Sequence, residues 1–210
     1  MDIADVFVFG DCFNDLPTSL EKLKLGQPTK EEHLIKLSKY KNLKSLCLKR
    51  SQTKWTWLKP EILPNLLKLC VNDQFAEEDI KSLPQNLREL DLTQCPDERR
   101  VRITCADPIT GQNFIYLPKS LIILRFLSLK KIKKEYLESS LPANLSEVYI
   151  EDCEDETLDN RKHQEKVKTL KENGIEVLDQ ESKCEYPNNK QELEIRGRKE
   201  MERILSGNNN

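Results

Sequence analysis

The stretch LPQNLRELDL, residues 83–92, decides the fold, because its spacing of leucines recurs along the chain. The template reads Leu-Pro, two variable residues, Leu, two variable residues, an apolar residue, one variable residue and a second apolar residue. Full matches are LPTSLEKLKL from Leu16, LPKSLIILRF from Leu117 and LPANLSEVYI from Leu141. Weaker copies are KYKNLKSLCL from Lys39 and LPNLLKLCV from Leu63. Such self-similarity is the signature of a repeat architecture.

The distances between successive copies indicate the kind of repeat. Copies start at 16, 39, 63, 83, 117 and 141, in steps of 23, 24, 20, 34 and 24 residues. Four of these five steps lie within roughly 20–29 residues, the period of leucine-rich repeats. We therefore expect the α/β class, as a leucine-rich-repeat solenoid with a curved parallel sheet on its concave face and short helices or irregular segments on its convex face.

The expected solenoid spans residues 1–182 and carries two local features. The longest step contains VRITCADPITGQNFIY, which predicts a hairpin-like insertion at about residues 97–116, with two short strands around a Pro/Gly turn. Farther on, HQEKVKTLKENGIEVLD predicts a terminal cap at about 157–180, formed by a helix, an Asn-Gly stop and a strand. Residues 183–210 form a tail with an amphipathic helix, which either caps the last repeat or reaches a partner.

Composition and charge exclude several classes of protein. Hydrophobic residues make up 37% of the chain and charged residues 33%, and the formal net charge of −2 argues against a general nucleic-acid binder. No apolar run approaches the roughly 20 residues that span a bilayer. The opening MDIADVFVFG lacks the basic region of a secretory signal peptide. The 7 cysteines form no Cys-x-x-Cys pair, so we expect reduced thiols and a cytosolic protein.

The sequence offers little that suggests catalysis. The only histidines, His33 and His163, lie far apart in charged helical surroundings, where we expect both at the surface. No Gly-rich phosphate loop, His-Glu-x-x-His or Gly-x-Ser-x-Gly motif occurs. Cys47 and Cys70 share one template position, but no further ligand completes a zinc site. We therefore expect no enzyme activity, no cofactor and no metal.

Alternate residues of each expected strand point away from the core and provide a candidate binding face. These outward residues change from lysines in the early copies to carboxylates in the later ones. Tyr149 and Arg125 are also among them, and tyrosine and arginine are residue types that dominate binding energy at interfaces. A solvated face that only maintains solubility is the alternative. The expected partner-binding residues are Lys22, Lys24, Lys49, Lys68, Glu89, Asp91, Ile123, Arg125, Leu127, Glu147, Tyr149 and Glu151.

The tryptophans of KWTWLKP lie between two copies of the template, on the outer side of the expected solenoid. Two residues apart, Trp55 and Trp57 fall on opposite faces of a strand, or about 200° apart on a helix. We therefore expect one indole to be packed and the other to be partly exposed.

The repeats resemble the leucine-rich-repeat family over about residues 4–180. Their Leu-Pro opening looks most like the repeats of effector proteins from intracellular bacterial pathogens, including the Legionella type. The resemblance implies a non-enzymatic secreted effector in the host cytosol. It would bind a host protein or a bacterial effector enzyme through its concave face, and would block or recruit that protein. Blocking would take the form of covering an enzyme's active site. From charge and composition we expect no nucleic-acid partner and no membrane span; the sequence leaves the oligomeric state open, with a monomer favoured.

Two alternatives remain open. Some effectors with such repeats add a ubiquitin-ligase domain with a catalytic Cys-x-Asp, and this chain contains that pattern at Cys95, Cys105 and Cys153. The repeats leave no room for a separate catalytic domain, and Cys95 and Cys153 fall where the template uses a buried Asn or Cys. The other alternative is a two-sided adaptor, in which the tail or the insertion at residues 101–116 binds a second partner.

Overall fold

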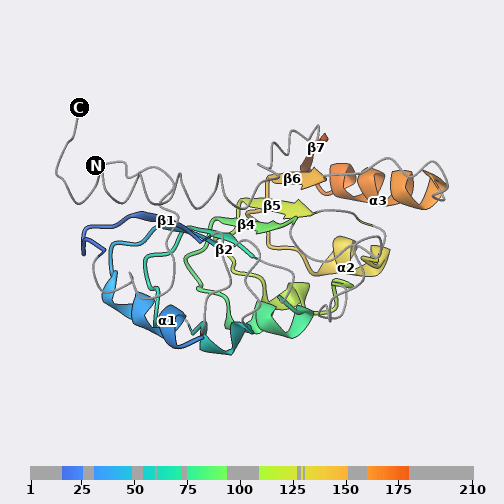
Figure 1. Cartoon of the computed structure of the whole chain (residues 1–210). Helices are drawn as coiled ribbons and strands as arrows, with labels where there is room; N and C mark the ends of the chain where they lie inside the picture. Colours follow the sequence, from blue (N-terminus) through green and yellow to red (C-terminus); the bar gives the residue numbers. More distant parts are fainter. Residues whose placement is uncertain are drawn as a thin grey trace, which may run out of the picture.

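Each copy of the template contributes one strand to a single parallel sheet in the computed structural model (Figure 1). The seven strands of the described residues pair in the order β1-β2-β3-β4-β5-β6-β7. Their bounds are β1 Lys22–Leu25, β2 Ser45–Leu48, β3 Lys68–Cys70, β4 Glu89–Leu92, β5 Ile123–Phe126, β6 Glu147–Ile150 and β7 Glu176–Asp179. The structure describes residues 16–25, 31–48, 54–59, 61–71, 75–93, 109–126, 129, 131–150 and 160–179. The expected α/β class with a parallel sheet is therefore confirmed.

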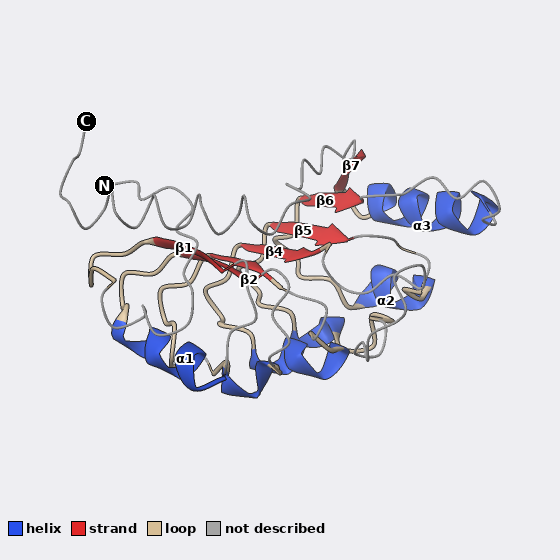
Figure 2. Cartoon of the chain, in the orientation of Figure 1, coloured by secondary structure: helices blue, strands red, loops and turns tan. Residues whose placement is uncertain are grey.

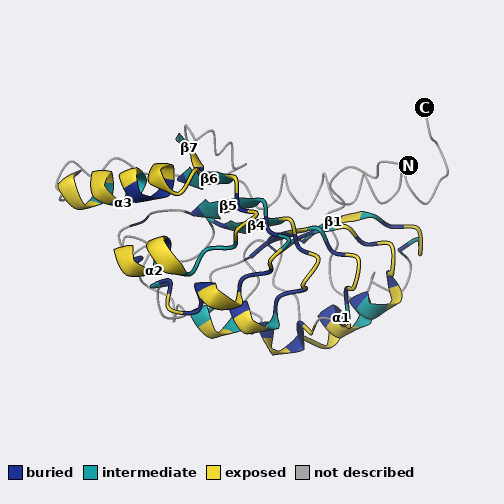
Figure 3. Ribbon diagram, turned by 180° about the vertical axis from the view of Figure 1, so that it is seen from behind, coloured by how far each residue is buried: buried dark blue, intermediate teal, exposed yellow. Residues whose placement is uncertain are grey.

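The leucines of the template form continuous buried rows, which we call ribs, across the sheet (Figure 3). Strand register places equivalent residues directly beside one another, so each strand buries its leucines against those of its neighbours. The central rib consists of Leu23, Leu46, Leu69, Leu90, Leu124 and Val148. The rib just before the strands consists of Leu20, Leu43, Leu66, Leu87, Leu121 and Leu145. Burying one leucine stabilises the fold by about 1.5–3 kcal/mol, so each rib contributes substantially to the stability of the core.

Short helical segments cover the opposite side of this core (Figures 1 and 2). Four of the seven segments in the described residues are short 3₁₀ helices, the form in which this helix usually occurs. Their bounds are α1 Glu31–Ile35, η2 Lys36–Lys39, η3 Trp55–Trp57, η4 Glu77–Ser82, η6 Phe114–Tyr116, α2 Lys134–Ser139 and α3 Asn160–Glu172. Gly174, with a φ of +77°, follows α3 and directs the chain into β7. A left-handed glycine is the usual residue at a helix C-terminus.

Both tryptophans of η3 are buried, so the expectation that one would be exposed is wrong. Trp55 is 1% and Trp57 3% exposed, and their rings stack with centroids 5.8 Å apart. A 3₁₀ helix has three residues per turn, so residues two apart are separated by about 120° and not by 180°. Both rings therefore reach the core, where Trp55 also packs edge-on against Phe75 at 5.2 Å.

His33 is also buried, contrary to its expected surface position, whereas His163 is half-buried. Within α1, Leu34 faces the core. Successive residues of a helix are about 100° apart, so the face that buries Leu34 also takes in His33. The charged neighbours Glu31 and Glu32 remain exposed.

The second strand of the expected insertion at 97–116 is replaced by a turn and by η6, while residues 97–108 lie outside the described part of the chain. A carboxylate from η4 holds this turn. Glu77 Oε2 accepts hydrogen bonds from Thr110 N at 3.0 Å and Thr110 Oγ1 at 2.7 Å, and Glu77 Oε1 accepts one from Asn113 N at 3.1 Å. Gly111, with a φ of +94°, permits the turn, and Phe114 then enters the core.

A ladder of side-chain amides joins consecutive repeats beside the strands. The residue before the rib leucine donates a hydrogen bond to a backbone carbonyl of the preceding repeat. The asparagine contacts are Asn42 Nδ2 to Thr18 O at 3.5 Å, Asn65 Nδ2 to Lys41 O at 2.8 Å, Asn86 Nδ2 to Pro64 O at 3.1 Å and Asn144 Nδ2 to Lys119 O at 2.8 Å. Ser120 Oγ takes this role in the remaining copy, where it lies 2.7 Å from the equivalent carbonyl, Gln85 O. The template thus contains a polar position with a structural role.

Replacing one ladder asparagine tests this role. We expect Asn86→Ala to lower the free energy of unfolding by about 1 kcal/mol, because Pro64 O loses its donor. Urea unfolding followed by circular dichroism measures the difference. Lys119→Ala, which truncates an exposed side chain two residues before a rib leucine, serves as the control and should leave the midpoint unchanged. Equal midpoints for Asn86→Ala and wild type would contradict the role of the ladder.

Candidate functional site

The sheet has a second face, turned away from the ribs, which we call the polar face. Strand register arranges its side chains in two rows that cross all seven strands. The first row is Lys22, Ser45, Lys68, Glu89, Ile123, Glu147 and Glu176. The second row is Lys24, Cys47, Cys70, Asp91, Arg125, Tyr149 and Leu178. Apart from Cys70, which is buried, these residues are exposed or half-buried.

The rows bring together most of the residues that sequence reasoning proposed for partner binding. Lys22, Lys24, Lys68, Glu89, Asp91, Ile123, Arg125, Glu147 and Tyr149 all lie on the polar face. Three further proposed residues, Lys49, Leu127 and Glu151, lie outside the described residues. The same holds for the Cys-x-Asp cysteines, Cys95, Cys105 and Cys153, and for the tail at 183–210.

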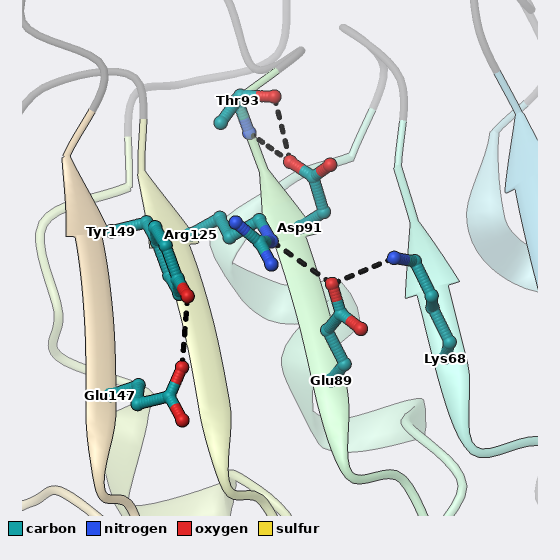
Figure 4. A network of polar contacts seen from close by, with 7 residues as sticks. All are labelled: Lys68, Glu89, Asp91, Thr93, Arg125, Glu147 and Tyr149. Atoms are coloured by element: carbon teal, nitrogen blue, oxygen red, sulfur yellow. Dashed lines mark hydrogen bonds and ion pairs between the residues drawn. The ribbon is translucent and has the colours of Figure 1, made fainter. Parts of the chain in front are cut away.

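Glu89 is the centre of an ion-pair network on three adjacent strands (Figure 4). Its Oε1 lies 2.8 Å from Lys68 Nζ on β3 and 2.9 Å from Arg125 Nε on β5. The side chains of Glu89 and Arg125 are both only 17% exposed, whereas Lys68 is 46% exposed. Burial alone would raise the pKa of Glu89, but the hydrogen bonds and charges of Lys68 and Arg125 outweigh it and lower that pKa. The carboxylate is therefore held in its charged form.

A cation–π contact extends this network to β6. The Arg125 guanidinium carbon lies 3.9 Å from the centroid of the Tyr149 ring, and Tyr149 Oη donates a hydrogen bond of 3.0 Å to Glu147 Oε2. That hydrogen bond is the main reason why the pKa of the Tyr149 phenol is raised. Figure 4 shows the tyrosine ring flat against the guanidinium, which lies between Tyr149 and Glu89. Lys68, Glu89, Arg125, Tyr149 and Glu147 thus form one continuous chain of contacts, which we call the cross-strand network.

Two further features border the cross-strand network. Asp91 Oδ1 accepts hydrogen bonds from Thr93 N at 3.0 Å and from Thr93 Oγ1 at 2.7 Å, which fixes Asp91 at the end of β4 (Figure 4). Cys47 and Cys70 are partners in the register of β2 and β3. Within the described residues, no group of three or more His, Cys, Asp and Glu side chains could hold a metal ion. No helix in the same part of the chain is long and apolar enough to cross a membrane.

Physically, the cross-strand network is suited to recognition. Its guanidinium and aromatic ring are fixed by neighbours, so little side-chain entropy remains to be lost when a partner binds. The contacts themselves were not anticipated from the sequence, although Lys68 and Glu89 are opposite charges at equivalent template positions of adjacent copies, which would have indicated their pairing. No protein-family model matches the chain, and no curated protein matches it significantly.

The ion pairs of Glu89 predict how stability depends on pH. Because the folded-state pKa of Glu89 is lowered, its stabilising contribution is present above the unfolded pKa of about 4.3 and is lost as the pH falls through the folded value. We expect Glu89→Gln to lower the free energy of unfolding by about 1–2 kcal/mol at pH 7. The difference in stability should shrink as the pH falls through the folded-state pKa of Glu89, because wild type then loses the same charge. Urea unfolding at several pH values measures it.

The matched control for this prediction is Glu165→Gln, which removes one carboxylate from the exposed side of α3. It should change stability little at any of these pH values. A deficit for Glu89→Gln that stays constant between pH 7 and pH 3 would contradict the proposed origin of the pKa shift.

Proposed function

We propose that this chain is a non-enzymatic protein-binding module of the leucine-rich-repeat type, which binds another protein through the polar face of its sheet. The observation that carries the proposal is the cross-strand network, because it fixes Arg125 on β5 and Tyr149 on β6 at that face. Arginine and tyrosine are enriched among the residues that dominate interface energies.

The arrangement of strands supports the solenoid part of the proposal. Each copy of the template supplies one strand, and the strands pair in sequence order with equivalent residues in register. Such stacking of short repeats is what defines a solenoid and gives it an extended surface for partners. The Leu-Pro opening of the copies supports the leucine-rich-repeat assignment.

The resemblance of the repeats to those of bacterial effectors favours a role as a secreted effector in the cytosol of a host cell. There it would either block or recruit its target, which is a host protein or another bacterial effector. Blocking is the more concrete mechanism, since a rigid sheet face loses little entropy on binding. Its fixed charges also offer contacts to the rim of an enzyme's active site.

Affinity capture with two variants tests the proposal. The tagged full chain is incubated with lysates of eukaryotic host cells and of bacteria, and retained proteins are identified by mass spectrometry. We expect Arg125→Ala and Tyr149→Ala each to weaken binding of the retained partner about tenfold or more, because each removes a central contact. Binding isotherms with the identified partner give the size of the effect.

The matched controls carry the same substitutions elsewhere: Arg161→Ala on α3 and Tyr116→Ala on η6, both of which change exposed side chains. They should bind like wild type. Circular dichroism verifies that all four variants are folded. The proposal fails if no protein is retained, or if the polar-face variants and the controls bind equally well.

A further inference from the structure

The polar face changes character from its centre to its β7 end. Across the last three strands the first row reads Ile123, Glu147 and Glu176, and the second row reads Arg125, Tyr149 and Leu178. The first row therefore becomes acidic, while the second row becomes aromatic and apolar beyond Arg125. Together these six residues form an amphipathic strip across β5, β6 and β7, which we call the β5–β7 strip.

The acidic side of the strip is not neutralised by any ion pair among the described residues. Glu147 and Glu176 are direct partners in the register of β6 and β7, where neighbouring strands lie about 4.8 Å apart. Like charges directly opposite each other destabilise a sheet. Within the described residues neither carboxylate forms an ion pair, and Glu147 accepts only the neutral hydroxyl of Tyr149. Glu89, by contrast, has two cations of its own chain.

The spacing of the strip fits a helix better than an extended segment. Residues three or four apart on a helix rise by about 4.5–6 Å, which matches the strand spacing of about 4.8 Å. Alternate residues of an extended segment are about 6.6 Å apart, so their spacing does not match the distance between the strands. The two rows are also about 6.6 Å apart along the strands, so a helix about 10 Å wide contacts both.

We propose that the β5–β7 strip binds an amphipathic helix of the partner protein, laid across the strands. Two basic residues of that helix, three or four positions apart, pair with Glu147 and Glu176, and its apolar residues pack on Tyr149 and Leu178. This inference rests on the proposed function, since it names the chemistry of the partner bound at that face. It follows from charge complementarity together with the row of apolar side chains beside the acidic pair.

The competing occupant is the chain's own C-terminal segment. Its sequence KQELEIRGRKEMERIL contains Arg196, Lys199 and Arg203 at helical spacing. The experiment must therefore distinguish binding of a helix that belongs to another molecule from binding of the chain's own C-terminal segment.

The experiment uses a fluorescein-labelled synthetic peptide with the full-length chain. The peptide consists of leucine and lysine, is about 18 residues or five helical turns long, and carries its lysines three and four positions apart. A second peptide of identical composition places lysine at every other position, the pattern of a strand. Fluorescence anisotropy at low ionic strength gives both dissociation constants. We expect the helical peptide to bind more tightly.

Variants then locate the binding. We expect Glu147→Gln/Glu176→Gln to weaken binding of the helical peptide about threefold to thirtyfold, the effect of losing two exposed ion pairs. Glu135→Gln/Glu165→Gln removes the same charge from exposed positions on α2 and α3 and should bind like wild type. Circular dichroism verifies the fold of both variants.

Equal binding of the two peptides, or equal affinities of the two double variants, would overturn the inference. Binding that appears only when the tail carries Arg196→Glu/Arg203→Glu would also overturn it, because the chain's own segment would then occupy the strip. Failure here remains distinct from failure of the proposed function. If Arg125→Ala abolishes partner capture while Glu147→Gln/Glu176→Gln leaves the peptide affinity unchanged, the binding face stands and the helical partner does not.

Discussion

Burial of the leucine ribs is the constraint on which the rest of this structure depends. A strand of four residues has too little apolar surface to fold alone, so each copy of the template is stable only against its neighbours. The leucines of adjacent strands must therefore lie in register, as Leu69, Leu90 and Leu124 do. Because side chains alternate along a strand, the same register fixes every residue of the polar face. The core thus determines where the charges lie.

The cross-strand network shows how much follows from this register. Lys68, Glu89 and Arg125 come from copies of the template that are far apart in sequence, yet they meet within ion-pairing distance. Stacking on Tyr149 then restricts the guanidinium further. Lys68 and Arg125 thereby neutralise Glu89, whereas Glu147 and Glu176 form no ion pair among the described residues. The polar face thus combines a rigid network with an acidic end.

The template was sufficient to predict the strands and the direction of their side chains, because successive side chains of a strand alternate between the two faces of the sheet. It could not predict the segments between strands. Trp55 and Trp57 are both buried because their segment is a 3₁₀ turn, and the turn at Thr110 depends on Glu77, a residue 33 positions away. The pairing of Glu89 was missed for a related reason: alternation gives the direction of a side chain but not which neighbour it reaches.

The asparagine ladder also bears on how such a protein changes over evolutionary time. Each amide reaches only the carbonyl of the preceding repeat, as Asn65 reaches Lys41 and Asn144 reaches Lys119. A duplicated repeat therefore supplies its own hydrogen bond to the repeat before it. Duplication or deletion of a repeat changes the contacts at a single junction between repeats. Gene duplication or deletion can lengthen or shorten the polar face in whole repeats, and the adjoining repeats keep their geometry.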